Sequence, residues 1–144
     1  MPDPELSPNK DEQATDYFNT ILYTGNGADN RTLTGVGFQT DWTWIKNRSN
    51  AGNNHILTDS SRGAGKEINS DLDVAEDTTN TNKLEAFTSD GFTLGASPHS
   101  SVNSNTHTYV AWNWHVNGGT TSSNGDGSIT STVQVSQKAG ISIV

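Results

Sequence analysis

Two pairs of tryptophans, each separated by one residue, constrain the fold of this chain more than any other feature. Trp42 and Trp44 lie in the run WTWIKNR, and Trp112 and Trp114 lie in TYVAWNWHV. In a β-strand, side chains two positions apart point to the same face, whereas in an α-helix they diverge. Both runs are rich in aromatic and β-branched residues, which favour strands. The pattern therefore predicts two strands that each present two indoles on one face.

Three interpretations of these indoles are open. We favour the first, in which they fill the core of a sandwich, between two facing sheets. In the second they stack on sugar rings, and in the third they form a subunit interface, because flat aromatic side chains anchor contacts well. For a bound ligand, the candidate residues are Trp42, Trp44, Trp112, Trp114 and His107.

The rest of the chain has the same short, extended character. Ser, Thr and Asn account for 51 of the 144 residues, and these residues favour turns, caps and strand surfaces over helices. Further strands are expected at 17–24, 32–38, 55–59, 92–94, 128–135 and 140–144, with short edge pieces within 66–86 and a turn at Asp90-Gly91. Many short strands separated by such turns predict an all-β protein, an antiparallel β-sandwich.

We expect the chain to have two parts. Residues 1–16 are rich in proline and charge, so they cannot bury enough apolar surface to fold alone, and we expect an extended N-terminal arm. Residues 17–144 would form the sandwich domain. The sequence stops within the apolar run GISIV. Either this run pairs at the edge of the sandwich, or the chain is the front part of a longer, repeated polypeptide.

Charge and composition argue against several classes of protein. The formal net charge is −8 and the eight Lys and Arg are scattered, whereas nucleic-acid binders carry basic patches. No apolar run approaches the ~18 residues that cross a bilayer. The chain has no cysteine, and its N-terminus lacks the apolar core of a signal peptide. We therefore expect synthesis in a reducing cytoplasm, no nucleic-acid partner, no membrane insertion and no general secretory export.

The sequence shows no established catalytic or metal-binding motif. It contains no G-x-S-x-G elbow and no H-E-x-x-H pair, and no strand carries the paired carboxylates of a glycan hydrolase. Asp71, Asp73 and Asp77 cluster in one loop and are weak candidates for a calcium site, but Glu76 stands where an EF-hand loop requires glycine. We expect no enzymatic activity, no cofactor and no bound metal.

Six segments resemble a repeated module in virion and tail proteins of marine phages, cyanophages in particular. They are YFNTILYTGNG (17–27), GVGFQTDWTWIKNR (35–48), HILTDSSRG (55–63), SDGFTLG (89–95), VNSNTHTYVAWNW (102–114) and DGSITSTV (126–133). The resemblance implies a concanavalin-like or SPRY-like sandwich of jelly-roll type. Thr40 stands where the family usually has Pro. The family also often repeats, with G-x-S-I-V beginning a second unit that is not present here.

The resemblance implies a non-enzymatic structural protein of the virion, part of a tail, fibre or capsid appendage assembled in the host cytoplasm. It would contact other virion proteins or a glycan on the host surface. It would be a homo-oligomer, because multivalency strengthens weak glycan binding by roughly 10²–10⁴. The alternative function is a stand-alone carbohydrate-binding module that uses the paired tryptophans and the Asn-rich loops. A glycan hydrolase is the least favoured alternative.

Overall fold

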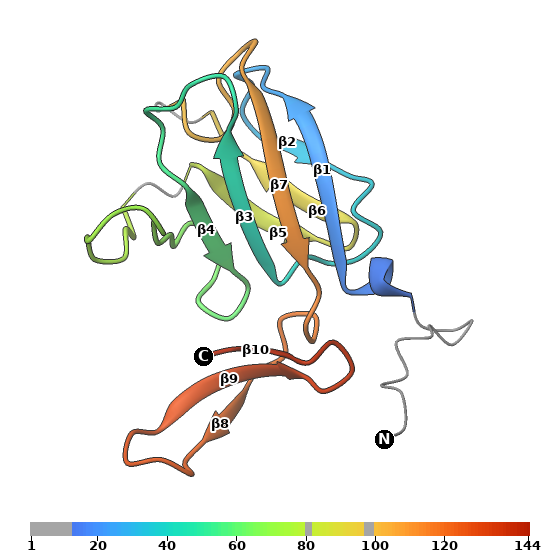
Figure 1. The fold of residues 1–144 in the computed structure, drawn as a ribbon, viewed down its shortest axis with the longest axis vertical. Coiled ribbons are helices and arrows are strands. Elements are labelled where there is room, and N and C mark those ends of the chain that lie inside the picture. The colour runs from blue at the N-terminus through green and yellow to red at the C-terminus, as the bar shows by residue number, and fades with distance from the viewer. Residues whose placement is uncertain (1–12, 80–81, 97–99) are drawn as a thin grey trace, which may run out of the picture.

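A computed structural model of the chain describes residues 13–79, 82–96 and 100–144 (Figure 1). Within these ranges the protein is all-β and antiparallel, as expected, with one short 3-10 helix, η1 (Ala14–Asp16). The strands are β1 (Phe18–Thr24), β2 (Arg31–Leu33), β3 (Trp42–Asn47), β4 (Ile56–Asp59), β5 (Leu84–Thr88), β6 (Gly91–Leu94), β7 (Thr108–Trp114), β8 (Ser122–Asn124), β9 (Ser131–Ser136) and β10 (Ile141–Ile143). Among the described residues, no helix has the length and apolar character that crossing a membrane requires.

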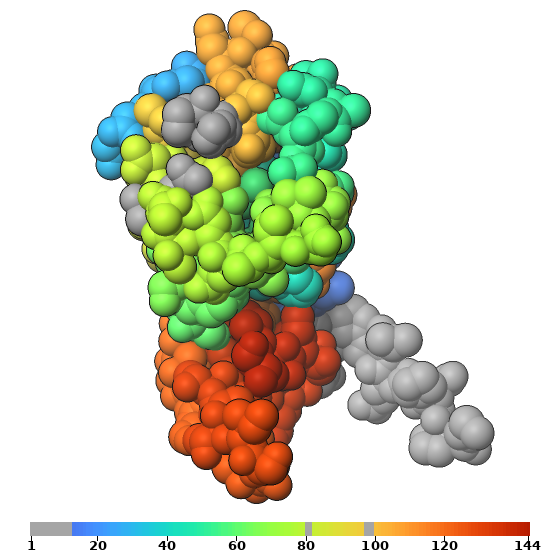
Figure 2. All heavy atoms as spheres, turned by 90° about the vertical axis from the view of Figure 1, so that its left-hand side faces the viewer, coloured from blue at the N-terminus to red at the C-terminus, as the bar shows by residue number. Residues whose placement is uncertain are grey.

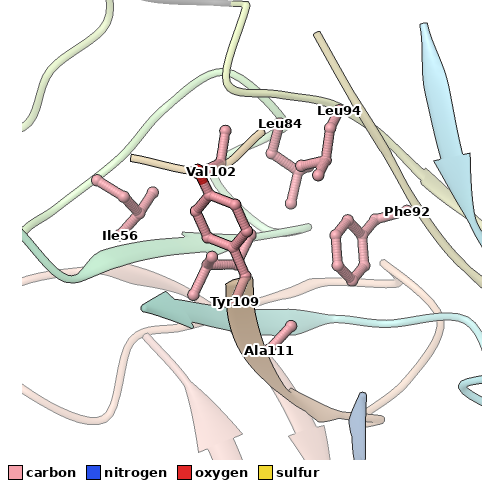
Figure 3. Packing of buried hydrophobic residues seen from close by; sticks show 8 residues of the cluster. Ile56, Leu84, Phe92, Leu94, Val102, Tyr109 and Ala111 are labelled. Atoms are coloured by element: carbon pink, nitrogen blue, oxygen red, sulfur yellow. The ribbon is translucent and has the colours of Figure 1, made fainter. Parts of the chain in front are cut away.

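Two of the three sheets face each other around one core. The four-stranded sheet has the order β1-β7-β3-β4, and the sheet behind it in Figure 1 has the order β2-β6-β5. Tyr109 of β7 lies among the buried side chains in Figure 3, and its ring stacks on Tyr23 of β1 with centroids 5.0 Å apart. The core cluster comprises Ile45, Ile56, Leu84, Phe92, Leu94, Val102, Tyr109 and Ala111. Two facing sheets with a shared apolar interior make the arrangement sandwich-like.

Polar side chains complete this core. Thr43 and Asn47 of β3 and Asn113 of β7 are buried. The Thr43 hydroxyl donates to Asn113 Oδ1 at 3.3 Å, and Asn47 Nδ2 donates to the carbonyl oxygen of Ser100 at 2.6 Å. Buried amides and hydroxyls are tolerated where they are hydrogen-bonded. These bonds allow a chain with only 30% hydrophobic residues to close an interior.

The third sheet, of order β10-β9-β8, lies beyond the end of β7, below the two layers in Figure 1. Asp41, fully buried just before β3, holds the start of the connection to it. Its Oδ2 accepts the backbone N–H groups of Val116, Asn117 and Gly118 at 2.7, 2.9 and 2.9 Å. Hydrogen bonds to a carboxylate are stronger than neutral ones. This side chain therefore sets the direction in which the chain leaves the sandwich.

Several expected strands differ in extent. The strand predicted at 32–38 ends at Leu33, because Gly35 and Gly37 adopt φ values of 88° and 93°. Their N–H groups donate to the side chain of Asp90 instead of to a neighbouring strand. The strand expected at 128–135 begins only at Ser131, and β8 was not predicted. The turn at Asp90-Gly91 is confirmed, since it joins β5 to β6.

The segment 66–86 was expected to contribute short edge pieces, and among its described residues the last three begin β5. Before it, Ile68 pairs with Leu57 and Glu67 pairs with Asp77 as isolated bridges. These bridges place the segment along the β4 edge of the four-stranded sheet.

The predicted arm at 1–16 lies mostly outside the described residues. Of its last four residues, Asp16 accepts the backbone N–H of Gln13 on Oδ2 at 2.7 Å, within the turn of η1. The carbonyl oxygen of Tyr17 then accepts the His115 N–H at 2.9 Å. The chain is therefore tied to the four-stranded sheet directly after η1.

Candidate functional site

The four tryptophans lie together on the outer face of the four-stranded sheet, turned away from the core. The register places Trp42 opposite Trp114 and Trp44 opposite Trp112, and directly opposite side chains share a face. Ring centroids of Trp42 and Trp114 are 4.6 Å apart at 25°, and those of Trp44 and Trp112 are 5.7 Å apart at 66°. Phe18 of β1 packs 5.0 Å from Trp114. We call Phe18 and the four tryptophans the aromatic face.

This position contradicts the prediction that the indoles fill the core. Burial alternates along β3, where Thr43, Ile45 and Asn47 are buried and Trp42 and Trp44 are only half-buried. The two-residue period correctly predicted that the tryptophans share one face of the sheet. That face is turned away from the core, not toward it as predicted. The indoles bury their surfaces mainly against one another.

Apolar side chains extend the aromatic face along its β1 side. Phe18 is 39% exposed, and Leu22 on the same side of β1 is 66% exposed. The polar atom of Trp44 is already satisfied, because its indole N–H donates to His55 Nδ1 at 2.8 Å. Large exposed apolar side chains that gather on one face of a sheet are typical of a contact site. The aromatic face is therefore the first candidate functional surface.

The C-terminal strand reaches the edge of the aromatic face. A cavity of about 190 Å³ is lined by Trp42, Ile68, Ile143 and Val144, among others. The aromatic face and β10 therefore meet at this cavity.

Arg62 stands on the wall of that cavity and is held by two carboxylates. Its guanidinium contacts Asp59 at 2.5 Å and Glu76 at 2.7 Å. Burial alone would lower the pKa of Arg62, but the hydrogen bonds to Glu76 and Asp59 outweigh it and raise the pKa. The charge of Arg62 is thus neutralised inside the protein, so it does not interrupt the aromatic face with a free cation.

A second candidate site is polar. A cavity of about 530 Å³, which we call the polar cavity, lies where residues 52–56, 67–77 and 100–101 meet, on the side of the molecule shown in Figure 2. Asn53, Asn54 and Asn69 line it together with Glu67 and Lys83, which form an ion pair. Sequence reasoning missed this site because its residues come from separate segments. The sequence signals for it were the Asn-rich composition of residues 50–54 and Asp77, which lines the cavity but was a candidate only for metal binding.

A family model described as a domain of unknown function (DUF7483) matches residues 13–144. The chain belongs to the DUF7483 family. The match spans both facing sheets and the C-terminal sheet, so the DUF7483 domain includes all three. Neither the curated proteins nor the solved structures gave a match to this DUF7483 chain.

In this DUF7483 domain, His107 lies apart from the aromatic face. It precedes β7, at the end opposite to Trp114, and it is half-buried. Its Nδ1 is 2.9 Å from the amide nitrogen of Asn47, and its carbonyl oxygen accepts the Gly25 N–H at 2.7 Å. The structure therefore does not bring His107 together with the other four candidate residues.

The three acidic candidates are also separate in the DUF7483 domain. Asp71 Oδ1 accepts the backbone N–H of His55 at 3.0 Å, and Asp77 Oδ1 accepts that of Thr79 at 2.8 Å. Asp73 is exposed. Across the described ranges, no three His, Cys, Asp or Glu side chains form a group that could hold a metal ion. Two of the three carboxylates, those of Asp71 and Asp77, are thus used to accept backbone hydrogen bonds.

Proposed function

We propose that the domain is a non-enzymatic structural module of a phage virion, part of a tail, fibre or capsid appendage, and that its copies associate through the aromatic face. The observation that carries the proposed association is the stacking of Trp42 and Trp114 on the outside of the sheet. The core is already closed by smaller side chains, among them Ile45 and Ala111. Large aromatic side chains on an outer face are typical anchors of protein interfaces.

The geometry of the aromatic face favours a protein partner over a sugar. A sugar ring stacks on an open indole plane, with polar groups nearby to bind its hydroxyls. Trp42 and Trp114 turn their planes toward each other at 4.6 Å, so each offers at most one plane. Their neighbours Phe18 and Leu22 are apolar and bury well against a second apolar surface. Carbohydrate binding through the tryptophans is therefore the less supported alternative.

The partner that we propose is a second copy of the same domain. Most homo-oligomers are symmetric, and a surface that pairs with itself about a two-fold axis buries the same residues on both sides. The net charge of −8 makes two copies repel each other over most of their surfaces. The aromatic face consists of uncharged side chains, so it is a favourable place for contact.

The six segments that resemble marine-phage virion modules support the virion as the location of this protein. The same resemblance supports a concanavalin-like, jelly-roll type for the two facing sheets. In this proposal the module works by contact alone, without a cofactor, without nucleic acid and without insertion into a membrane.

Sedimentation of the purified chain at increasing concentration tests the association. Leu22→Lys should weaken it at least about tenfold, because burying an ammonium group beside the aromatic face costs more than about 1.4 kcal/mol. Ile129→Lys is the matched control, since Ile129 is 82% exposed in the turn between β8 and β9, and it should associate like the wild type. A chain that stays monomeric throughout, or a Leu22→Lys variant that associates normally, would contradict the proposed interface.

Electron microscopy tests the virion assignment. A gold-labelled antibody against the domain should mark a tail or appendage on particles of a phage that encodes this chain. Particles without label would remove that assignment.

A further inference from the structure

The polar cavity lies at the β4 edge of the sandwich, and none of the residues that line it belongs to the aromatic face. Its volume of about 530 Å³ falls in the range of roughly 300–1,000 Å³ that is typical of small-molecule sites. Ile56 is the aliphatic residue in the lining of the cavity, and amides and hydroxyls line most of the remaining surface. The cavity therefore has room for a small molecule, and its chemistry suits a polar one.

Two buried charges form part of its wall. Glu67 and Lys83 are 4% and 7% exposed, and they pair with each other. The backbone of Glu67 exchanges two hydrogen bonds with that of Asp77, at 3.0 and 2.9 Å. These bonds fix the position of the Glu67 backbone, from which the carboxylate extends. A buried ion pair adds little net stability, because the loss of hydration offsets the attraction. The pair places a carboxylate and an ammonium group in the wall of the cavity, beside its amides and hydroxyls.

The rim of the cavity is also ordered before any ligand binds. Asn53 Nδ2 donates to Ser100 Oγ at 2.7 Å, and the Ser100 hydroxyl donates to Asn53 Oδ1 at 3.0 Å. Asn69 Nδ2 donates to the carbonyl oxygen of His55 at 2.8 Å, which leaves the amide oxygen of Asn69 as an acceptor. Side chains that are already positioned lose less entropy when they bind a ligand.

The donors and acceptors of the cavity select a class of ligand. Amides both donate and accept hydrogen bonds, an ammonium group donates and a carboxylate accepts. Hydroxyl groups of a ligand can satisfy all of them. An anion would be repelled by two carboxylates, those of Glu67 and Asp77, and attracted by one ammonium group, that of Lys83. An apolar ligand would leave buried polar groups without hydrogen-bond partners. A neutral polyhydroxylated molecule fits these groups best.

We propose that the polar cavity binds a neutral sugar residue, as part of a glycan. This inference goes beyond the proposed function, which concerns association through the aromatic face, and it does not depend on that association. It would give a virion module a glycan site at one edge and a self-association surface on another face.

Nuclear magnetic resonance titration tests this site directly. The probes are glucose, galactose, mannose, N-acetylglucosamine and their short oligosaccharides, with glucuronic acid as a charged comparison. At least one neutral sugar should shift the side-chain amide signals of Asn53, Asn54 and Asn69 in a saturable way, and glucuronic acid should bind more weakly. The proposal is overturned if no neutral sugar gives saturable shifts, or if the shifts map to the aromatic face instead.

Variants then locate the site. Asn54→Ala and the double variant Lys83→Gln/Glu67→Gln should each weaken sugar binding about tenfold, as expected for the loss of one or two hydrogen bonds. The matched control is Asn105→Ala, which removes an exposed asparagine outside the cavity and should bind like the wild type. Leu22→Lys should also bind sugar normally, which separates this proposal from that for the aromatic face. Wild-type affinity in a folded Asn54→Ala chain and in the folded double variant overturns the assignment.

Discussion

Trp42 and Trp114 stack with ring centroids 4.6 Å apart, from directly opposite positions on neighbouring strands of the outer sheet face. Their contact is separate from the core, so replacing either residue with alanine should leave the fold intact. We expect a double-mutant cycle of Trp42→Ala and Trp114→Ala to give a coupling energy of about 0.5–1.5 kcal/mol, from urea unfolding. A matched cycle of Trp42→Ala with Ile129→Ala should give a value near zero. Coupling that is equally small in both cycles would show that the stack contributes nothing beyond burial.

Asp41 should prove essential for the position of the C-terminal sheet. Asp41→Asn removes the negative charge and leaves a single oxygen as acceptor, so the three N–H groups lose their charge-assisted hydrogen bonds and we expect a loss of about 2–4 kcal/mol in unfolding free energy. Hydrogen exchange should accelerate most at Val116, Asn117 and Gly118, the donors to Oδ2. Ser60→Ala, which removes the hydroxyl on Oδ1, is the milder control. Unchanged exchange at the three donors in Asp41→Asn would argue against this role.

Gly25 should tolerate no side chain. A methyl group on its Cα would lie 2.1 Å from the carbonyl oxygen of Ser104, which belongs to the loop that precedes β7. Gly25→Ala must therefore displace backbone, and we expect a destabilisation of about 2 kcal/mol or more in thermal or urea unfolding. At Gly125 the same substitution meets nothing within 4 Å. Gly125→Ala should change stability little, and similar losses in the two variants would contradict the steric argument.

Asp90 should contribute a pH-dependent part of the stability. Its carboxylate accepts the N–H groups of Gly35 and Gly37, and these hydrogen bonds lower the pKa of Asp90 in the folded protein. Because the folded pKa is below the unfolded value of about 3.9, the stabilisation is present above that pH and is lost as the pH falls through the folded pKa.

The measurement for Asp90 is the unfolding free energy of the wild type and of Asp90→Asn, between about pH 6 and pH 2. The wild type should be the more stable protein at the upper end, and the difference should shrink as the pH falls below the unfolded pKa. Comparing the two proteins cancels the titration of the other carboxylates. A difference that stays constant over the range would mean that the ionised form of Asp90 is not the one bound by the glycines.

Thr40 connects two segments that are distant in the sequence. Thr40 is fully buried, and its hydroxyl donates to the carbonyl oxygen of Gly91 at 3.0 Å. The bond ties the start of β3 to the start of β6. A proline could not make it, because proline has neither a hydroxyl nor an N–H.

The local alternation of the sequence was sufficient to predict the main strands. The run 108–116 predicted β7 together with its two faces, and Asp90-Gly91 predicted the hairpin of β5 and β6. It failed where glycines with positive φ ended a strand early, at Gly35 and Gly37. A strand follows from a pattern that extends over several neighbouring residues, and such a pattern can be read in the sequence. The end of a strand can depend on the backbone angles of a single residue, which the pattern does not reveal.

Which face of each strand is buried was decided only by the tertiary structure. Alternation places Trp42 and Trp44 together and Thr43 and Asn47 together, but hydrophobicity alone assigns the wrong set to the core. Asn47 can be buried because Ser100, distant in sequence, accepts its hydrogen bond.

The candidate sites depend on contacts of the same long-range kind. The aromatic face requires the register between β3 and β7, and the polar cavity requires three separate segments to meet. The sequence by itself therefore determined strands, turns and the pairing of the tryptophans on one side. The folded structure decided burial and binding surfaces, because buried polar side chains such as Asn47 depend on hydrogen-bond partners that residues distant in the sequence supply.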